Sequence, residues 1–181
     1  MISFLESLKI VCARLDGARI PYMISGSTAA NLYAQPRATN DVDIVIQVDQ
    51  GRSEELLNLF QRDFYISKEA VDDAFGGIGM VNIIHQTSVI KFDLIILKTD
   101  DFSRSAFARR TKETFEGREF WFISLEDLVL QKFLWHKEGG SELQREDVRR
   151  LVLANRTRLD VSYCSEWAGR LQIGELMKEL L

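Results

Sequence analysis

Hydrophobic and polar positions repeat with two different periods along the chain, and the change of period divides it into a mixed part and a helical part. Apolar residues recur at helical spacing from Ile2 to Leu15, which predicts an amphipathic helix. Short apolar runs bounded by turn residues follow and predict strands. The predicted strands cover residues 20–25, 41–46, 81–84, 89–97 and 120–123.

Helical patterns separate these strands and fill the rest of the chain. Ser27 begins a short helix that Pro36 ends, because proline cannot continue a helix. A hairpin turn near Gln86–Thr87 joins two strands, whereas helices join others, so the sheet is expected to be mixed. Further helices are predicted at residues 53–60, 67–75, 125–137 and 141–154, with one or two more between Asp160 and Leu181.

Together these elements predict an α+β fold, in which helices flank a mixed β-sheet and a small C-terminal helical subdomain follows. We expect the sheet-containing core to occupy residues 1–123 and the helical subdomain to occupy residues 124–181. A chain of 181 residues is long enough for one substantial hydrophobic core with a smaller appended unit.

Three aspartates on two of the predicted strands are the main candidates for chemistry. Asp41 and Asp43 share one face of their strand, because alternate strand residues point the same way. Asp93 lies in the apolar run from Val89 to Leu97, where an ionised carboxylate without a partner would cost several kcal/mol. Because Mg²⁺ prefers oxygen ligands and is often shared with substrate phosphates, all three are candidate ligands for Mg²⁺ or Mn²⁺.

A phosphate site is expected next to the first two aspartates. Gly26 and Ser27 stand where a helix begins, and free N–H groups at a helix N-terminus attract anions. Arg37 and Thr39 lie in the loop before Asp41 and are either turn residues or phosphate contacts. The glycine-rich run at residues 76–79 lacks the Lys-Ser/Thr of a phosphate-binding loop and is expected to be a flexible turn.

Two adjacent C-terminal helices each place one charge on an apolar stripe. Lys132 follows Leu128 by one turn, and Asp147 lies one turn from both Leu143 and Leu151, which are expected to face the core. Lys132 and Asp147 therefore form either a structural salt bridge or part of a functional site. Ser124, with an acid three residues later, resembles a capping box at the start of the first of these helices.

The order of these motifs resembles the nucleotidyltransferase (DNA polymerase beta-like) superfamily. Gly-Ser before a short helix, Asp-Val-Asp on the next strand and a third aspartate on a later strand carry the resemblance. The segments SLEDLVLQK and REDVRRL make the chain similar to small stand-alone bacterial members of the AbiEii toxin type. The resemblance implies that the three carboxylates bind the metal, that the serine contacts the triphosphate, and that a lysine and an aspartate complete the site. Carried over, these roles fall on Asp41, Asp43 and Asp93, on Ser27, and on Lys132 and Asp147, which together form the expected catalytic set. With the candidates from the helix start and its loop, the expected nucleotide contacts are Gly26, Ser27, Arg37, Thr39 and Lys132.

The expected reaction is Mg²⁺-dependent transfer of a nucleoside monophosphate from an NTP to an acceptor hydroxyl. The resemblance implies the 3′ end of a tRNA as one acceptor and a cognate antitoxin as a protein partner. Two alternatives stay open. The first is a transferase acting on a small molecule such as an aminoglycoside, and the second is a catalytically inactive protein that binds a nucleotide or a partner with the same fold.

Composition limits the class of protein further. The net charge of −4 argues against a protein that coats nucleic acid, although the basic segment 101–118 either is solvated or borders the cleft. Cys12 and Cys164 are far apart and outside any C-x-x-C motif, so neither a disulfide framework nor a zinc site is indicated. The N-terminus lacks the unbroken apolar run of a signal peptide, and we expect a cytoplasmic protein without a membrane segment.

Overall fold

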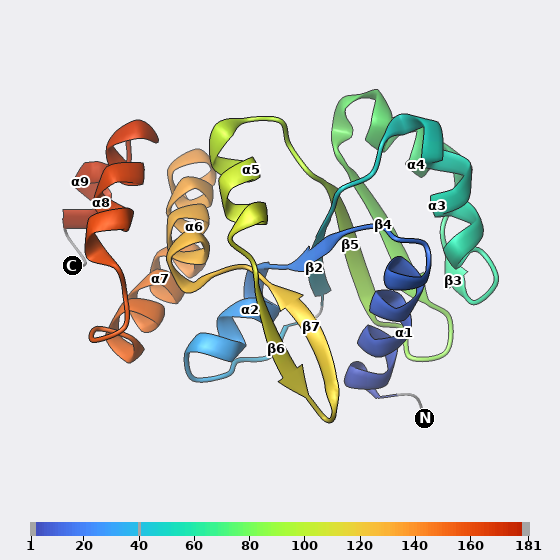
Figure 1. The fold of residues 1–181 in the computed structure, drawn as a ribbon, viewed down its shortest axis with the longest axis horizontal. Coiled ribbons are helices and arrows are strands. Elements are labelled where there is room, and N and C mark those ends of the chain that lie inside the picture. Colours follow the sequence, from blue (N-terminus) through green and yellow to red (C-terminus); the bar gives the residue numbers. More distant parts are fainter. Residues whose placement is uncertain (1–2, 40, 179–181) are drawn as a thin grey trace.

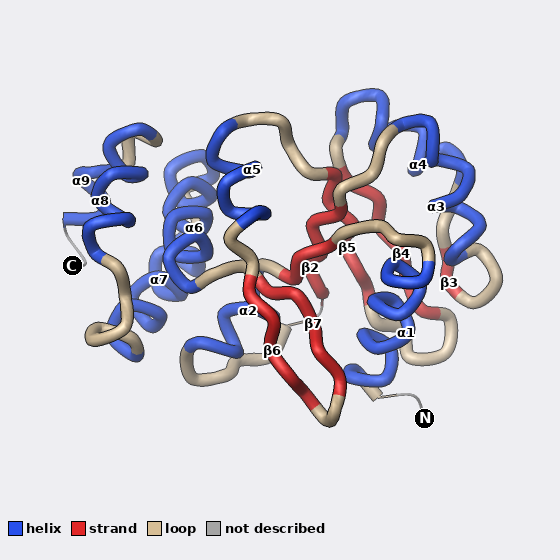
Figure 2. Tube along the Cα trace, in the orientation of Figure 1, coloured by secondary structure: helices blue, strands red, loops and turns tan. Residues whose placement is uncertain are grey.

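The computed structural model describes residues 3–39 and 41–178 and consists of a seven-stranded mixed sheet with helices on both faces (Figures 1 and 2). The strands are β1 (Tyr22–Ile24), β2 (Asp41–Ile46), β3 (Phe64–Tyr65), β4 (Met80–His85), β5 (Lys91–Ile96), β6 (Thr111–Phe115) and β7 (Arg118–Phe122). The helices are α1 (Phe4–Gly17), α2 (Gly26–Tyr33), α3 (Ser53–Phe60), α4 (Lys68–Asp73), α5 (Asp101–Ala108), α6 (Leu125–Gly139), α7 (Glu142–Ala154), α8 (Val161–Arg170) and α9 (Gly174–Lys178). The predicted α+β class is confirmed.

The sheet has the strand order β3-β4-β5-β2-β1-β7-β6. Strand β2 runs parallel to β5 and antiparallel to β1, while β4 and β5 form the predicted antiparallel hairpin. The two central strands β2 and β5 therefore carry all three candidate carboxylates side by side.

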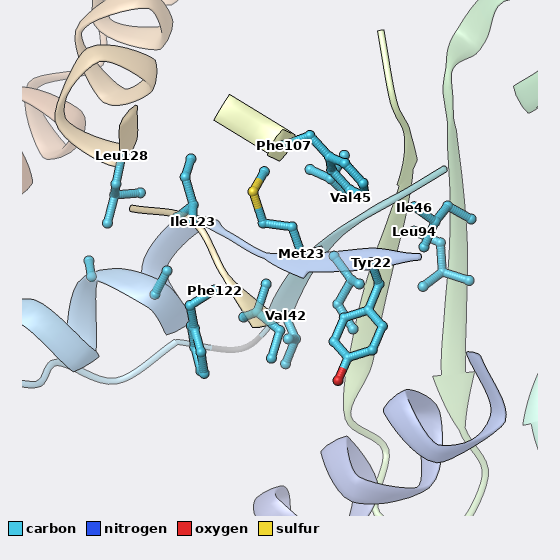
Figure 3. Close-up of a cluster of buried hydrophobic side chains, with 14 of the residues drawn as sticks. Tyr22, Met23, Val42, Val45, Ile46, Leu94, Phe107, Phe122, Ile123 and Leu128 are labelled. Carbon is cyan, nitrogen blue, oxygen red and sulfur yellow. The ribbon is translucent and has the colours of Figure 1, made fainter. Parts of the chain in front are cut away.

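The core fills both faces of the sheet, and β1 shows how the chain divides between them. Tyr22 points towards α1, whereas Met23 points the opposite way with Val45, towards Phe107 of α5 (Figure 3). This alternation is the period of a strand buried on both sides. The face of Met23 and Val45 is covered by α5 and α6, and it is the face on which the candidate site forms.

The structure corrects several sequence predictions. A single strand was expected at residues 120–123, but β6 and β7 form a hairpin whose turn, Glu116–Gly117, has positive φ at both residues. The short strand β3 was not predicted either. The expected flexible turn at residues 76–79 is partly a π-helical turn, Ala74–Ile78. The predicted N-terminal helix is α1, and Ile2 lies outside the described residues.

Helices α6 to α9 form the C-terminal part of the fold (Figure 1). The hydroxyl of Ser124 accepts a hydrogen bond from the backbone N–H of Asp127, as the capping pattern predicted. Leu143 was expected to face the core but is 52% exposed, so that prediction is wrong. The boundary between residues 123 and 124 stays a prediction, and residues 179–181 of the predicted terminal helix lie outside the described part. Within the described residues, no helix is both long and apolar enough to cross a membrane.

Candidate active site

The register of β2 and β5 builds a row of carboxylates. Asp43 is directly opposite Asp93, and Asp41 is opposite Lys91. Because the strands are parallel and in register, these side chains project from the same face at neighbouring positions. The structure thus brings Asp93 beside Asp41 and Asp43, which the sequence placed on a different strand.

Asp93 is only 6% exposed and has two partners inside the chain. Asn82, opposite Asp93 on β4, donates a hydrogen bond to its Oδ1 over 2.5 Å. The Lys91 ammonium lies 3.1 Å from Asp93 Oδ2 and 3.7 Å from Asp41 Oδ2, so it bridges two of the three carboxylates. The cation that a buried Asp93 was expected to need is therefore supplied, in this structure, by Lys91.

Asp43 lies directly against the start of α2. The backbone N–H of Ser25 donates to the Asp43 carbonyl over 2.9 Å. Gly26 has φ +62°, and a Cβ on it would lie 1.8 Å from Asp43 Oδ2. No side chain fits between them, which explains why glycine stands at this position.

The charge of Asp43 is the least compensated of the three. Burial raises its pKa to about 6, and the neighbouring charges of Asp41 and Asp93 act in the same direction, while Lys132 and Lys91 oppose them. Concentrated negative charge of this kind favours a cation between the carboxylates.

A cleft of about 450 Å³ opens over Asp41 and Asp43, beside the N-terminus of α2. Its lining combines the residues expected to contact phosphate with residues of the two following helices. They are Ser27, Arg37, Ala38, Thr39, Asp41, Asp43, Trp135, Leu143 and Gln144. The Thr39 hydroxyl donates to Asp41 Oδ1 over 3.0 Å, which orients this carboxylate at the edge of the cleft.

Arg37 links the cleft to the helical part of the chain. Its Nη2 donates to the Ser27 hydroxyl over 2.7 Å, and its Nε and Nη2 donate to the two oxygens of Asp147 over 3.0 and 2.9 Å. The bidentate contact fixes the plane of the guanidinium. It raises the pKa of Arg37, chiefly through the hydrogen bonds that the guanidinium donates to Asp147.

Lys132 and Asp147 meet beneath this cleft, so the predicted contact between them is confirmed. Lys132 is 0% exposed, and its Nζ donates to Asp147 Oδ2 over 2.8 Å and to Gln144 Oε1 over 2.9 Å. Burial lowers the pKa of Lys132, against the effect of Asp147. Burial also opposes ionisation of Asp147, but hydrogen bonds from Arg37 and Lys132 outweigh it and lower its pKa. The sequence predicted Lys132 to contact the triphosphate directly, but Lys132 is buried and is not among the residues that line the cleft. It contacts Gln144, which does line the cleft.

Sequence reasoning missed four residues of this site: Asn82, Lys91, Trp135 and Gln144. Lys91 shares a strand face with Asp93, and that alternation could have identified it. Trp135 follows Lys132 by three residues on α6, and Gln144 precedes Asp147 by three residues on α7. This helical spacing is a weaker indication that both residues lie near the site. The basic segment 101–118, in turn, forms α5, β6 and the turn that leads into β7.

The donor set suits a hard divalent cation. Among the described residues, no group of three or more carboxylate, histidine or cysteine side chains is already arranged so that it could hold a metal ion. In this structure the Lys91 ammonium lies between Asp41 and Asp93, and these two carboxylates with Asp43 are the residues that would hold a metal ion. The three aspartates offer only oxygen ligands and, with the surplus charge around Asp43, fit Mg²⁺ or Mn²⁺.

Comparisons with known proteins identify the fold. No protein-family model matches the chain, and no curated protein sequence matches it. An antigenic nucleotidyltransferase-like protein from Paracoccidioides brasiliensis superposes with a TM-score of 0.63 at 20% identity, over 97% of this chain and 88% of that one. ANT(2'')-Ia in complex with adenylyl-2''-tobramycin superposes with a TM-score of 0.60 at 15% identity, over 92% of this chain and 94% of that one.

A third solved structure, the lincosamide antibiotic adenylyltransferase LnuA bound to lincomycin, gives a TM-score of 0.55 at 12% identity, over 83% of this chain and 96% of that one. Identities this low establish the fold alone. Combined with the glycine-serine helix start and the row of three aspartates, they show that this chain has the nucleotidyltransferase fold.

Proposed function

We propose that the protein transfers a nucleoside monophosphate from an NTP to an acceptor hydroxyl, with Mg²⁺ or Mn²⁺ as cofactor. One observation carries the proposal: the N-terminus of α2 abuts the carboxylate row, with Asp43 Oδ2 in the space that a Cβ of Gly26 would fill. A helix N-terminus attracts phosphate, whereas carboxylates repel it. The two features are compatible when cations lie between them, as nucleotidyl transfer requires.

Each residue then has a defined task. The N–H groups at the start of α2 and the Ser27 hydroxyl bind the triphosphate, and Arg37, 2.7 Å from that hydroxyl, adds positive charge. Asp41, Asp43 and Asp93 would hold the metal, which neutralises the phosphate charge and stabilises both the entering and the leaving oxygen. The acceptor oxygen forms a bond to the α-phosphorus and passes its proton to Asp93, while the bond to the bridging oxygen breaks and pyrophosphate leaves with that electron pair.

Lys132 and Asp147 act as positioning residues in this scheme. Asp147 holds both the Arg37 guanidinium and the Lys132 ammonium, and Arg37 in turn holds the Ser27 hydroxyl. Loss of Asp147 would therefore reach the triphosphate site through Arg37, without direct contact with substrate.

Two kinds of acceptor follow from different observations. The resemblance to AbiEii-type toxins suggests an RNA 3′ end, in particular a tRNA, with an antitoxin as partner. The structural likeness to ANT(2'')-Ia with adenylyl-2''-tobramycin and to LnuA with lincomycin suggests a small molecule. Both kinds of acceptor belong in the experiment.

The test is incubation of the purified chain with Mg²⁺ and each α-labelled NTP, in the presence of total tRNA, total cell protein or a set of hydroxyl-bearing small molecules. Asp43→Asn should abolish labelling, because it removes a charge from the carboxylate row. Asp49→Asn is the matched control, since Asp49 is exposed in the segment after β2. Labelling by Asp43→Asn at the rate of Asp49→Asn would contradict the assignment.

One observation favours a second candidate, a protein that binds nucleotide without turnover. Lys91 already bridges Asp41 and Asp93, and a permanent bridge would occupy the place of the metal. Isothermal titration with ATP and Mg²⁺ separates the two candidates. Tight binding without a labelled product from any acceptor supports the binding protein and refutes the transferase.

A further inference from the structure

A second cavity, of about 340 Å³, lies between the sheet and helices α5 and α6. Its lining is mainly apolar and includes Met23, Val45, Ile95, Phe102, Ala106 and Leu134. Ile95 on β5 and Leu134 on α6 are only partly buried, although residues 92–94, which precede Ile95 on β5, are buried. Apolar side chains that remain partly uncovered in a concave cavity of this size favour a ligand with an apolar body.

This apolar cavity continues the carboxylate cleft along the two central strands. Val45 lies two residues after Asp43, and Ile95 lies two residues after Asp93, so each pair shares a strand face. Two residues of a strand span about 7 Å. Trp135 lines both the cleft and the cavity. A ligand in the apolar cavity can therefore place one end beside the carboxylate row.

The groups that suit a triphosphate lie on the other side of that row. Ser27 and Arg37 line the cleft at the Asp41 end of β2, whereas the apolar cavity begins at Val45. The acidic residues Asp100 and Glu138 outnumber Lys98 among the charged residues of the cavity lining. A lining of this charge disfavours a triphosphate and disfavours the backbone of a nucleic acid.

We propose that the apolar cavity binds the acceptor, and that the acceptor is a small alcohol with an apolar body. The inference rests on the nucleotidyl transfer proposed above. In-line displacement brings the attacking oxygen to the side of the phosphorus opposite the leaving pyrophosphate. With the triphosphate at Ser27, that side faces Val45 and Ile95. The oxygen–phosphorus bond forms there, the proton passes to Asp93, and pyrophosphate departs towards α2.

Methyl NMR of the full chain, labelled at Met and Ile methyls, tests the site with benzyl alcohol as the probe. The signals of Met23 and Ile95 should shift and saturate as the alcohol is added. Ala106→Leu adds volume to the lining of the cavity and should abolish these shifts. Ala108→Leu, at an exposed position of the same helix, should leave them as in the wild type. Ser103→Leu fills the same cavity if Ala106→Leu does not fold.

Three results would overturn the inference. The first is the absence of saturable shifts at Met23 and Ile95, and the second is shifts that persist in both filling variants. The third is displacement of benzyl alcohol from these methyls by ATP, which would assign the cavity to the nucleobase.

Transfer assays separate this inference from the proposed function. If tRNA is labelled and Ala106→Leu labels it at the wild-type rate, the acceptor lies elsewhere, although nucleotidyl transfer stands. If benzyl alcohol shifts the methyls but no acceptor is labelled with ATP and Mg²⁺ present, nucleotidyl transfer fails and the acceptor role fails with it. Labelling that Ala106→Leu reduces at least tenfold and Ala108→Leu leaves unchanged supports both.

Discussion

Replacing Gly26 with alanine tests the contact on which the site depends. Gly26 has φ +62°, and an added Cβ would lie 1.8 Å from Asp43 Oδ2 and 2.7 Å from its Cγ. Real Cβ atoms do not approach other atoms so closely. Gly26→Ala must therefore push the Asp43 side chain out of the carboxylate row or displace the start of α2.

The expected loss of stability has two parts. A residue with a Cβ costs about 1–2 kcal/mol in the left-handed region, and an overpacked contact adds about 1–3 kcal/mol. Gly140→Ala is the matched control, because Gly140 has φ +64° and an added Cβ there meets nothing within 4 Å. The control has only the first cost, so the difference between the two variants measures the contact with Asp43.

Urea unfolding followed by tryptophan fluorescence supplies the free energies of unfolding. A double-mutant cycle with Asp43→Ala completes the measurement, since that change removes the carboxylate that the new Cβ would strike. The two changes should couple by about 1–3 kcal/mol. Equal destabilisation by Gly26→Ala and Gly140→Ala, or additive effects of Gly26→Ala and Asp43→Ala, would refute the contact.

Three further predictions concern charged groups. Asp147→Ala should lower the free energy of unfolding, measured in urea, by about 3–5 kcal/mol, because it leaves Lys132 buried without its counter-ion. At the exposed position Glu142, the change to alanine should alter it by no more than about 0.5 kcal/mol. Similar values for the two variants would contradict the buried pair. Lys91→Met should tighten Mn²⁺ binding about fivefold in an electron paramagnetic resonance titration, because the ion pair of about 1 kcal/mol between Lys91 and Asp93 no longer competes with the metal. Unchanged or weaker binding would show that Lys91 does not compete with the metal. The hydrogen bond from Arg14 lowers the pKa of Asp63, so Asp63 stabilises the fold above its unfolded pKa of about 4 and loses this effect as pH falls below it. The difference in Tm between wild type and Asp63→Asn should be present at pH 7 and vanish near pH 2. A difference in Tm that stays constant with pH would be evidence against this titration.

Sequence patterns were sufficient to predict features that depend on the periodicity within one helix or strand. Alternation along residues 41–46 and 89–97 placed the aspartates on strands, and the helical period placed Lys132 and Asp147 on buried stripes. The same reasoning failed for Leu143, which has the spacing of a core residue but lines the cleft beside Trp135. Periodicity identifies a helix face, but it does not say whether a neighbour covers all of that face.

Register is the information that the sequence lacked. A hairpin turn centred on Gln86–Thr87 would pair Asp93 with Met80, whereas the observed loop is centred one residue later and pairs Asp93 with Asn82. A shift of one residue in the turn moves every cross-strand pair by two positions. For this reason the hydrogen bond from Asn82 to Asp93 could not be predicted, although both strands were.

The cluster of Arg37, Asp147 and Lys132 joins the sheet-containing part of the chain to the helical part beside the candidate site. Ser27 belongs to the sheet-containing part, yet its hydroxyl is held by Arg37, whose orientation is fixed by Asp147 of α7. Burying a lysine and an aspartate gives little net stability, because desolvation offsets their attraction. What the cluster does provide is a fixed distance between the start of α2 and the helices that line the cleft. A triphosphate bound at Ser27 would therefore depend on residues from both sides of the predicted boundary at residue 123.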